Sequence, residues 1–313
     1  MTPPPTPPPL RPRRGRAGLL VLLLGLMTLP GLHSVEFPPG WDYDTAREAP
    51  QHSNPTPTWT NAPGFGRDVF TFVRIRYKAK GKNLTNYFYV GQRRWQIDFP
   101  DSDLNLSFRL QQMTAIKVNP DGRVLRLTDP ELLRYPWIYM VEPGDLELTD
   151  EEVPILRRYL LNGGFLMCDD FWGQAEWDNL AEEMKKVFPD REFVELPMEH
   201  PIFHCVFDLN VEKNQLQCPN VRYGEDSQYD PLHRTYEFDR SQGYVNWDRP
   251  DAVDMHVRAL HDDQGRIMVI ATHNTDNGDG WEREGEYKYY FREFSEKRAF
   301  PLGINIIFYA MTH

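Results

Sequence analysis

Acidic, amide and imidazole side chains follow three predicted strands at the points where those strands end. The strands are the apolar runs 137–141, 165–168 and 266–272, and the polar residues after them are Glu142, Asp169, Asp170, His273, Asn274, Asp276 and Asp279. In an open parallel sheet, ligands bind outside the carboxyl ends of the strands. If the three strands are neighbours, these side chains converge in one crevice. Such a cluster can bind a hard cation through oxygen atoms, or place an acid and a base around a substrate.

All seven of these residues are candidates for a ligand-binding site, and some of them are also candidates for metal binding or catalysis. The candidate metal ligands are Asp169, Asp276 and Asp279, and the candidate catalytic residues are Asp169, Asp170 and His273. Trp172 and Trp281 lie a few residues beyond the clusters and could form a wall for a sugar or a peptide. The alternative role is structural, because Asp and Asn after strands commonly cap helices and stabilise turns. The segment 274–280 resembles a calcium loop only loosely, since its spacing does not match an EF-hand.

The commonest catalytic and cysteine motifs are absent from the sequence. It contains no GxSxG elbow, no HExxH, no GxxxxGK[ST] and no GxGxxG that opens a helix after a strand. The three cysteines are an odd number and include no CxxC pair. Cys205 and Cys218 could pair in an oxidising compartment, whereas Cys168 lies in an apolar run and is predicted to be a small buried residue. The sequence motifs therefore do not indicate a cofactor.

The spacing of apolar residues predicts strands that alternate with helices. Predicted strands cover residues 70–77, 137–141, 165–168 and 193–196, and a hairpin covers 255–260 and 266–272. Predicted helices cover residues 101–118, 149–160, 175–188 and 303–311, the second beginning with a capping box from Thr149 to Glu152. We therefore expect a flavodoxin-like α/β fold, with a mostly parallel sheet, helices on both faces and a late β-hairpin. Residues 197–250 lose this alternation and are interpreted as a loop-rich insertion.

The amino-terminal region predicts export. Residues 1–34 combine four arginines with an apolar run of thirteen residues at 17–29, which suits a signal peptide better than a spanning helix. The domain is then periplasmic or extracellular, or it is anchored by this segment if cleavage does not occur. Residues 35–65 are rich in proline and are predicted to form a linker or an extended arm, so that the folded domain covers residues 66–313.

Net charge narrows the classes of partner. The formal net charge is −11, and the sequence has no basic stripe with interleaved aromatic residues. A strongly acidic surface repels phosphate backbones, which argues against a nucleic-acid partner. Contact with a membrane is expected only through the amino-terminal segment. Small molecules, sugars, peptides and envelope proteins remain as candidate partners.

Several spaced segments together resemble a known bacterial family. They are Gly163 to Leu166 with Asp169 to Phe171, Val187 to Pro189, His200 to Phe203, His273 to Asp276, Gly278 to Glu282, and Asn305 to His313. In this combination the chain resembles the domain-of-unknown-function family 4159 over roughly residues 66–313. The resemblance implies a fold similar to class I glutamine amidotransferases and an exported or membrane-attached protein, but it supplies no activity.

The amidotransferase residues themselves do not carry over. Those enzymes place a cysteine nucleophile in a GxCxG elbow, whereas Cys168 has no glycine on either side, and His273 lacks a glutamate two positions later. The leading hypothesis is thus an exported domain that binds a ligand or partner without glutamine hydrolysis. One alternative is a hydrolase, metal-assisted or not, that uses Asp169 or Asp170 with His273. A third hypothesis is a structural subunit of an envelope complex.

Overall fold

The computed structural model describes residues 43–65, 68–80, 94–229 and 251–313. These residues all belong to one compact unit, Gly40–His313. The predicted signal or anchor segment, residues 1–34, and residues 230–250 of the predicted insertion lie outside the described ranges. Within those ranges, no helix is both long and apolar enough to cross a bilayer.

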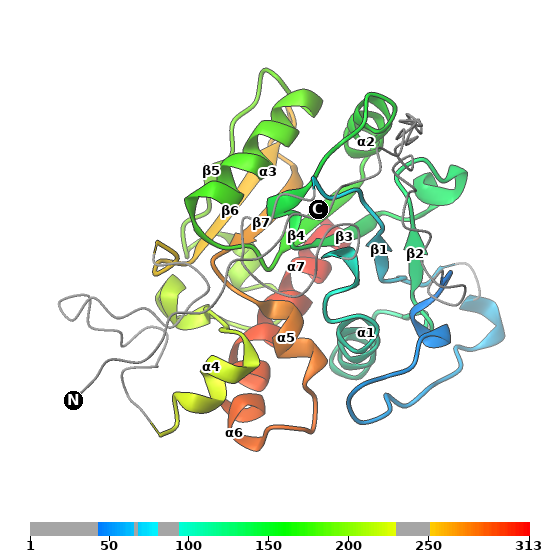
Figure 1. Ribbon diagram of the computed structural model, residues 1–313. Coiled ribbons are helices and arrows are strands. Elements are labelled where there is room, and N and C mark those ends of the chain that lie inside the picture. Colours follow the sequence, from blue (N-terminus) through cyan, green and yellow to red (C-terminus); the bar gives the residue numbers. More distant parts are fainter. Residues whose placement is uncertain (1–42, 66–67, 81–93, 230–250) are drawn as a thin grey trace, which may run out of the picture. The chain divides into compact units, whose positions relative to one another are not determined.

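A seven-stranded sheet forms the centre of the described domain (Figure 1), with the strand order β2-β1-β3-β4-β7-β6-β5. The strands are β1 (Val73–Ile75), β2 (Arg123–Leu125), β3 (Trp137–Val141), β4 (Phe165–Asp169), β5 (Val194–Glu195), β6 (His256–His261) and β7 (Ile267–His273). Strands β2, β1, β3, β4 and β7 pair in parallel. The mostly parallel α/β fold is therefore confirmed.

The late hairpin reverses one strand. β6 pairs antiparallel with both β7 and β5. Strand β6 lies between β7 and β5. As a result, β5 runs in the same direction as β7 and β4, but it pairs only with β6. The turn between β6 and β7 is held by Asp262, whose Oδ1 accepts hydrogen bonds from the amides of Gln264 and Arg266 at 2.9 Å each. The hairpin predicted from the sequence is thus present at the far side of the sheet.

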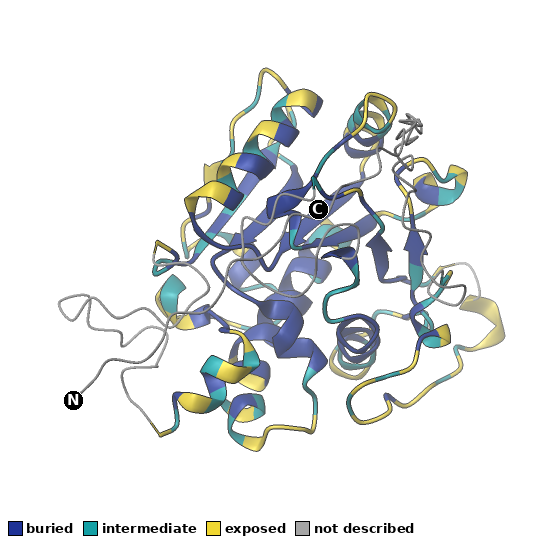
Figure 2. Ribbon diagram, in the orientation of Figure 1, coloured by how far each residue is buried: buried dark blue, intermediate teal, exposed yellow. Residues whose placement is uncertain are grey.

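Helices cover both faces of the sheet, as the apolar strands predict. On one face, α2 (Glu152–Leu161) and α3 (Gly173–Val187) pack against Ile138 and Met140 of β3. On the other face, α1 (Asp101–Met113) and α7 (Phe300–Thr312) pack against Trp137, Tyr139 and Val141. Figure 2 shows the central strands buried between these layers. All five residues of β3 are buried, which explains its continuous apolar sequence.

The ends of α2 and α1 can be compared with the helix ends that the sequence predicts. The capping box of α2 is confirmed, since the amide of Glu152 donates to Thr149 Oγ1 at 3.2 Å and the amide of Thr149 donates to Glu152 Oε2 at 2.9 Å. Helix α1 ends at Met113, earlier than the predicted 118, because Val118 instead bridges to Phe70 beside the sheet. Pro100 occupies the N-cap position of α1, and Asp101 accepts a hydrogen bond from the arm described next.

The proline-rich segment is an arm over its described part, residues 43–65. Ala46 is fully buried, and the amides of His52 and Ser53 donate to the carboxylate of Asp101 at 2.8 and 3.3 Å. The folded part therefore begins earlier than the expected residue 66. The arm places His52 next to Glu282, at 3.8 Å between Nδ1 and Oε1.

Short helices complete the domain. The short α-helices are α4 (Val221–Asp226), α5 (Asn277–Glu282) and α6 (Lys288–Tyr290), and a π-helix covers Phe291–Ala299. Single 3₁₀ turns cover Ala46–Glu48, Pro63–Phe65, Arg94–Gln96, Pro130–Arg134, Pro143–Asp145, Pro201–Phe203 and Lys213–Leu216. The described part of the predicted insertion, 197–229, thus contains α4 and two of these turns.

Candidate metal centre

Three buried carboxylates meet beyond the carboxyl ends of the parallel strands. Asp170 directly follows β4, Asp276 is the N-cap residue of α5 just after β7, and Asp98 precedes α1 in the connection between β1 and β2. One oxygen of each lies within 4.8 Å of one oxygen of each other. We call Asp98, Asp170 and Asp276 the carboxylate cluster. Because parallel strands end at the same edge of a sheet, the topology itself brings these distant residues together.

Asp98 differs from the other two members in its hydrogen bonding. Asp170 Oδ1 accepts from the indole Nε1 of Trp172 at 2.8 Å, and Asp276 Oδ1 accepts from the amide of Asp279 at 2.7 Å. The Asp98 residue is partly exposed, but its Oδ2 is buried and has no hydrogen-bond donor among the described residues. A buried polar atom without a partner is costly and requires an explanation.

Mutual repulsion and burial act on the ionisation of the cluster. Burial raises the pKa of all three carboxyl groups well above the ordinary value. The carboxylates then raise one another's pKa further: Asp170 and Asp98 both act on Asp276, while Asp98 acts on Asp170. Without a bound cation, burial and this repulsion therefore favour the protonated carboxyl groups. A divalent cation would replace those protons.

Unusual backbone conformations allow the side chains of the carboxylate cluster to approach one another. Asp98 and Asp170 both adopt the left-handed region, with φ of 60° and 56°. Asp is one of the few residue types other than glycine that enters this region readily. Gly278 of α5 supplies the space, since a Cβ atom there would lie 1.9 Å from Asp98 Oδ2. The absence of a side chain at Gly278 thus allows Asp98 to reach the start of α5.

A second group of carboxylates adjoins the first and shares Asp98 with it. Oxygens of Asp98, Asp279 and Glu282 also lie within 4.8 Å of one another. Arg283 accompanies this group, with its Nη2 3.1 Å from Glu282 Oε2 and its Nε 3.6 Å from Asp279 Oδ1. Burial, followed by the charge of Asp279, raises the pKa of Glu282 to about 9. A third group, His52 with Asp101 and Glu282, lies at the arm.

Comparison with known proteins identifies the family. A family model described as "Domain of unknown function (DUF4159)" matches residues 71–311, which is more than three quarters of the chain. The chain belongs to the DUF4159 family. A search of curated proteins gives no match. The family resemblance expected from the sequence is therefore confirmed, and the matched residues of this DUF4159 domain include both carboxylate groups.

Asp169 of the DUF4159 domain is a structural anchor. Its Oδ1 accepts hydrogen bonds from Thr272 Oγ1 and from Asn277 Nδ2, the latter at 2.7 Å. Its Oδ2 accepts from the amide of Gly278 at 3.1 Å and from the Tyr139 hydroxyl at 3.2 Å. Burial raises the pKa of Asp169 to about 6, although these donors oppose the rise. The predicted metal ligand and catalytic candidate thus fixes the first turn of α5 to the end of β4.

His273 lies among aromatic rings. Its Nε2 donates to the carbonyl of Gly173 at 3.0 Å, and its Nδ1 faces the Arg258 guanidinium at 3.4 Å. The imidazole stacks on Phe171, with 4.8 Å between ring centroids, and packs against Trp177. Burial lowers the pKa of His273 to about 3, so that the ring is neutral. Both ring nitrogens are occupied, and the structure does not join His273 to the carboxylate cluster.

Replacement of His273 by Gln tests this placement. We expect His273→Gln to lower the thermal midpoint of the full chain in EDTA, because the buried stacking contacts are lost. The rise in midpoint on addition of Mn²⁺ should equal that of the wild type. Differential scanning fluorimetry measures both quantities. If the variant folds but Mn²⁺ no longer raises its midpoint, His273 would instead be part of the cation site.

The remaining predicted ligands have structural partners. Asn274, with φ of 60°, accepts from the amide of Gly173 at 2.8 Å and donates to the carbonyl of Asp254 at 2.7 Å. The indoles of Trp172 and Trp281 are buried, and Trp281 Nε1 donates to the carbonyl of Ala299 at 2.8 Å. Neither indole offers an exposed face for a sugar or a peptide. Glu142, half-buried, pairs with Arg94 at 2.6 Å.

All three cysteines are free. Cys168 is buried, as predicted, and burial raises its thiol pKa. The suggested disulfide between Cys205 and Cys218 is not formed, since Cys205 Sγ lies 3.2 Å from the carbonyl of Asn305 and Cys218 Sγ lies 3.7 Å from that of Phe294. Burial also raises the thiol pKa of Cys218 to about 12. These thiols stay protonated and are poor nucleophiles and poor metal ligands.

Sequence reasoning did not single out Asp98, nor did it assign a role to Glu282. Glu282 stands within a segment that carries the family resemblance, three residues after Asp279. The available signal for Asp98 was the strand-end rule, which states that ligands bind outside the carboxyl ends of parallel strands. Applied to β1, this rule does not reach Asp98, because more than twenty residues separate Asp98 from the end of that strand.

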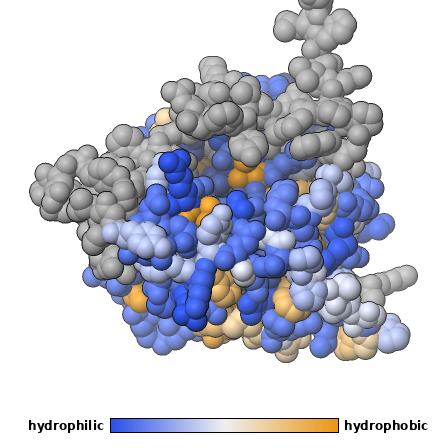
Figure 3. Space-filling view, turned by 60° about the horizontal axis from the view of Figure 1, so that its bottom comes forward, coloured by the Kyte–Doolittle hydropathy of each residue, from blue (hydrophilic) through white to orange (hydrophobic). Residues whose placement is uncertain are grey.

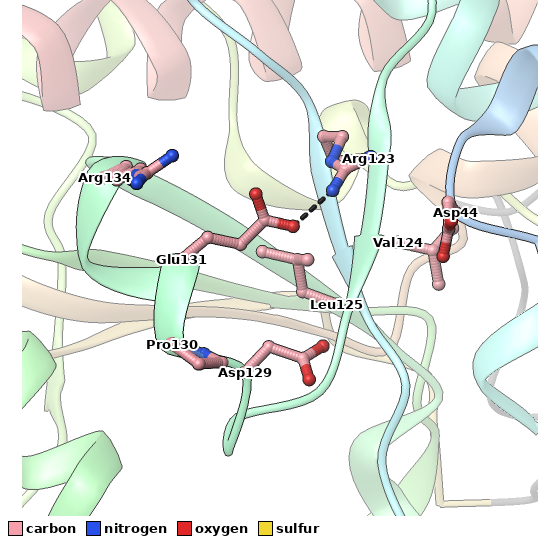
Figure 4. Close-up of a pocket in the computed structure, with 8 residues that line it drawn as sticks. All are labelled: Asp44, Arg123, Val124, Leu125, Asp129, Pro130, Glu131 and Arg134. Carbon is pink, nitrogen blue, oxygen red and sulfur yellow. Dashed lines mark hydrogen bonds and ion pairs between the residues drawn. The ribbon is translucent and has the colours of Figure 1, made fainter.

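A separate pocket lies beside the edge strand β2 of the DUF4159 domain (Figure 4). Its lining residues are Asp44, Arg123, Val124, Leu125, Asp129, Pro130, Glu131 and Arg134. Arg123 and Glu131 pair with each other across it. The surface in Figure 3 is mostly hydrophilic, with apolar residues scattered rather than gathered in one patch. Neither feature offers a stronger site than the buried carboxylates.

Proposed function

We propose that the domain binds a hard divalent cation through the carboxylate cluster of Asp98, Asp170 and Asp276. The observation that carries this proposal is the buried Oδ2 of Asp98, which lacks a donor and faces two further buried carboxylates within 4.8 Å. A cation bound there would satisfy this oxygen and neutralise the cluster. The domain would thus be a ligand-binding protein, as the leading hypothesis from the sequence states, with a metal ion as the first ligand.

The donor set favours Mg²⁺, Mn²⁺ or Ca²⁺. All three candidate ligands are carboxylate oxygens, which are the donors that hard cations prefer. Softer metals favour thiolate and imidazole, but the Cys218 thiol and His273 have other partners, and burial raises the pKa of the Cys168 thiol. Backbone carbonyl oxygens and water would complete a coordination shell of six or more.

The number of hydrogen bonds that a buried acid accepts distinguishes a cation site from a structural role. Structural acids in buried sites are hydrogen-bonded, and Asp169 shows this arrangement with four donors. The cluster members accept far fewer bonds, with one side-chain donor on Asp170 and one backbone donor on Asp276. Turn formation or helix capping explains Asp276 in part, but it leaves Asp98 without a role.

The hydrolase alternative takes a different form in this structure. It was expected to pair Asp169 or Asp170 with His273, yet Asp169 is an anchor and His273 lies in the aromatic layer. A hydrolase would therefore depend on the cation, which can polarise a substrate or lower the pKa of a bound water. Binding of a cation does not depend on whether residues 1–34 direct export.

Thermal unfolding of the full chain tests the proposal. The midpoint is measured in EDTA and then with Mg²⁺, Mn²⁺ or Ca²⁺ in excess. A ligand that binds only the folded state stabilises it by about 2.7 kcal/mol at a hundredfold excess over its dissociation constant. We expect a clear rise with at least one ion for the wild type and none for Asp98→Asn.

Asp190→Asn is the matched control, because it removes the same charge from an exposed acid. This variant should keep the full rise. An equal rise in the wild type, Asp98→Asn and Asp190→Asn would place the ion elsewhere, and no rise with any ion would refute the proposal.

A further inference from the structure

Asp98 belongs to two groups of three carboxylates at once. It lies within 4.8 Å of Asp170 and Asp276 on one side, and within 4.8 Å of Asp279 and Glu282 on the other. The five side chains form one continuous array in which Asp98 is the shared member. A carboxylate has two oxygens and can bridge two metal ions, which lie about 3.5–4 Å apart in two-metal sites.

The charge of this array exceeds what one divalent cation would neutralise. Five carboxylates together with the Arg283 guanidinium carry a formal charge of −4 when ionised. One divalent cation would leave two buried negative charges. The guanidinium of Arg74 also acts on Asp98 and lowers its pKa, but the charge of Arg74 is offset by Asp103, with which it pairs inside the core.

The second group is held in place by helix α5. Asp276, Asp279 and Glu282 are spaced three residues apart, so they lie on one face of the helix. Asp169 fixes the first turn of α5 through Asn277 and Gly278, as described above. Trp281 fixes the last turn through its bond to the carbonyl of Ala299.

Close packing then limits any movement of the helix. A Cβ atom at Gly280 would lie 2.3 Å from the Cβ of Ala299 in the π-helix, so α5 and the π-helix are in direct contact. The positions of Asp279 and Glu282 are therefore set before any ion binds, which favours binding.

We propose that Asp98, Asp279 and Glu282 hold a second divalent cation, and that Asp98 bridges it to the first. This inference rests on the proposed function and deepens it, since the site becomes a two-ion centre. Arg283 lies beside the second ion. Its Nη2 contacts Glu282 Oε2 and leaves Oε1 available, and its Nε lies 3.6 Å from Asp279 Oδ1, too far for a hydrogen bond. Asp279 keeps its Oδ2 bond to the amide of Val221 at 2.7 Å and offers Oδ1.

Counting bound Mn²⁺ on the full chain tests the second ion. The protein is treated with EDTA, dialysed and titrated with Mn²⁺, and free Mn²⁺ is measured by electron paramagnetic resonance. We expect two equivalents for the wild type and for the control Asp190→Asn. Glu282→Gln should weaken one equivalent at least tenfold, Asp276→Asn should weaken the other by a similar factor, and Asp98→Asn should weaken both.

The outcomes separate the second ion from the first. One equivalent in the wild type that Glu282→Gln leaves unchanged would overturn the second ion and keep the proposed function. No bound Mn²⁺ in the wild type would overturn both. Two equivalents that survive Asp98→Asn would also overturn the bridged centre. If Glu282→Gln fails to fold by circular dichroism, Asp279→Asn serves in its place, because an asparagine oxygen can still accept from Val221.

Discussion

Asp169→Ala is expected to lower the free energy of unfolding by about 3 to 5 kcal/mol. The side chain accepts hydrogen bonds from Thr272, Asn277, Gly278 and Tyr139, and all of these donors are buried. Each buried donor left without a partner costs about 1–3 kcal/mol. The loss also frees the first turn of α5 from β4. Urea denaturation of the full chain measures the change.

Two comparisons make the result specific to the anchor. Asp190→Ala removes an exposed acid and should change the free energy of unfolding by less than about 0.5 kcal/mol. Asp169→Asn keeps two acceptor lone pairs but introduces two donors among existing donors, so it should fall between these values. A loss below about 1 kcal/mol for Asp169→Ala would show that the four bonds do not fix α5.

Asp276→Asn is expected to have opposite effects with and without an ion. In EDTA at pH 8, the variant should be more stable than the wild type, because it removes a buried carboxyl whose pKa is raised. Asn is as good an N-cap as Asp, so the bond from the Asp279 amide is retained. With saturating Mn²⁺ the order should reverse, since the variant loses a ligand.

The sign of the pH dependence follows from the raised pKa values. A carboxyl group with a raised pKa in the folded state contributes stability at low pH and loses it as pH rises toward the folded value. In EDTA, the wild type should therefore lose stability between pH 6.5 and 8.5, the range below the pKa of about 9 for Glu282. His273, with its pKa lowered to about 3, acts in the opposite direction, but only below about pH 6.5.

Denaturation in EDTA from pH 6.5 to 8.5 measures this slope. Asp276→Asn should show a shallower decline than the wild type, and saturating Mn²⁺ should remove most of the decline in the wild type. Equal slopes for the two proteins in EDTA would contradict the raised pKa of Asp276.

The sequence predicted the sheet because its signals are local. The run at residues 137–141 is apolar throughout and became β3, which is buried on both faces. The Thr149 capping box and the Asp-Gly turn of the hairpin also depend on neighbours only a few residues away. Helix α1 ended early because Val118 pairs with Phe70, a contact between residues far apart in the chain. Local patterns do not contain that information.

The candidate site was predicted only in part, for the same reason. The strand-end rule located Asp170, Asp276 and Asp279, which follow their strands closely. It also selected Asp169 and His273, which differ from the others in their hydrogen bonds rather than in their positions along the chain. Asp98 needed the fold itself, because its approach depends on the tertiary position of Gly278.

A crystal structure with Mn²⁺ tests the central claim most directly. Anomalous scattering locates Mn²⁺ without reference to the protein coordinates. We predict a peak among Asp98, Asp170 and Asp276. The carboxylate oxygens should lie about 2.0–2.3 Å from the ion, a range that extends from typical Mg²⁺ distances to the short end of the Ca²⁺ range. A structure from Mn²⁺-containing crystals with peaks only at exposed acids, and with Asp98 Oδ2 still without a partner, would contradict it.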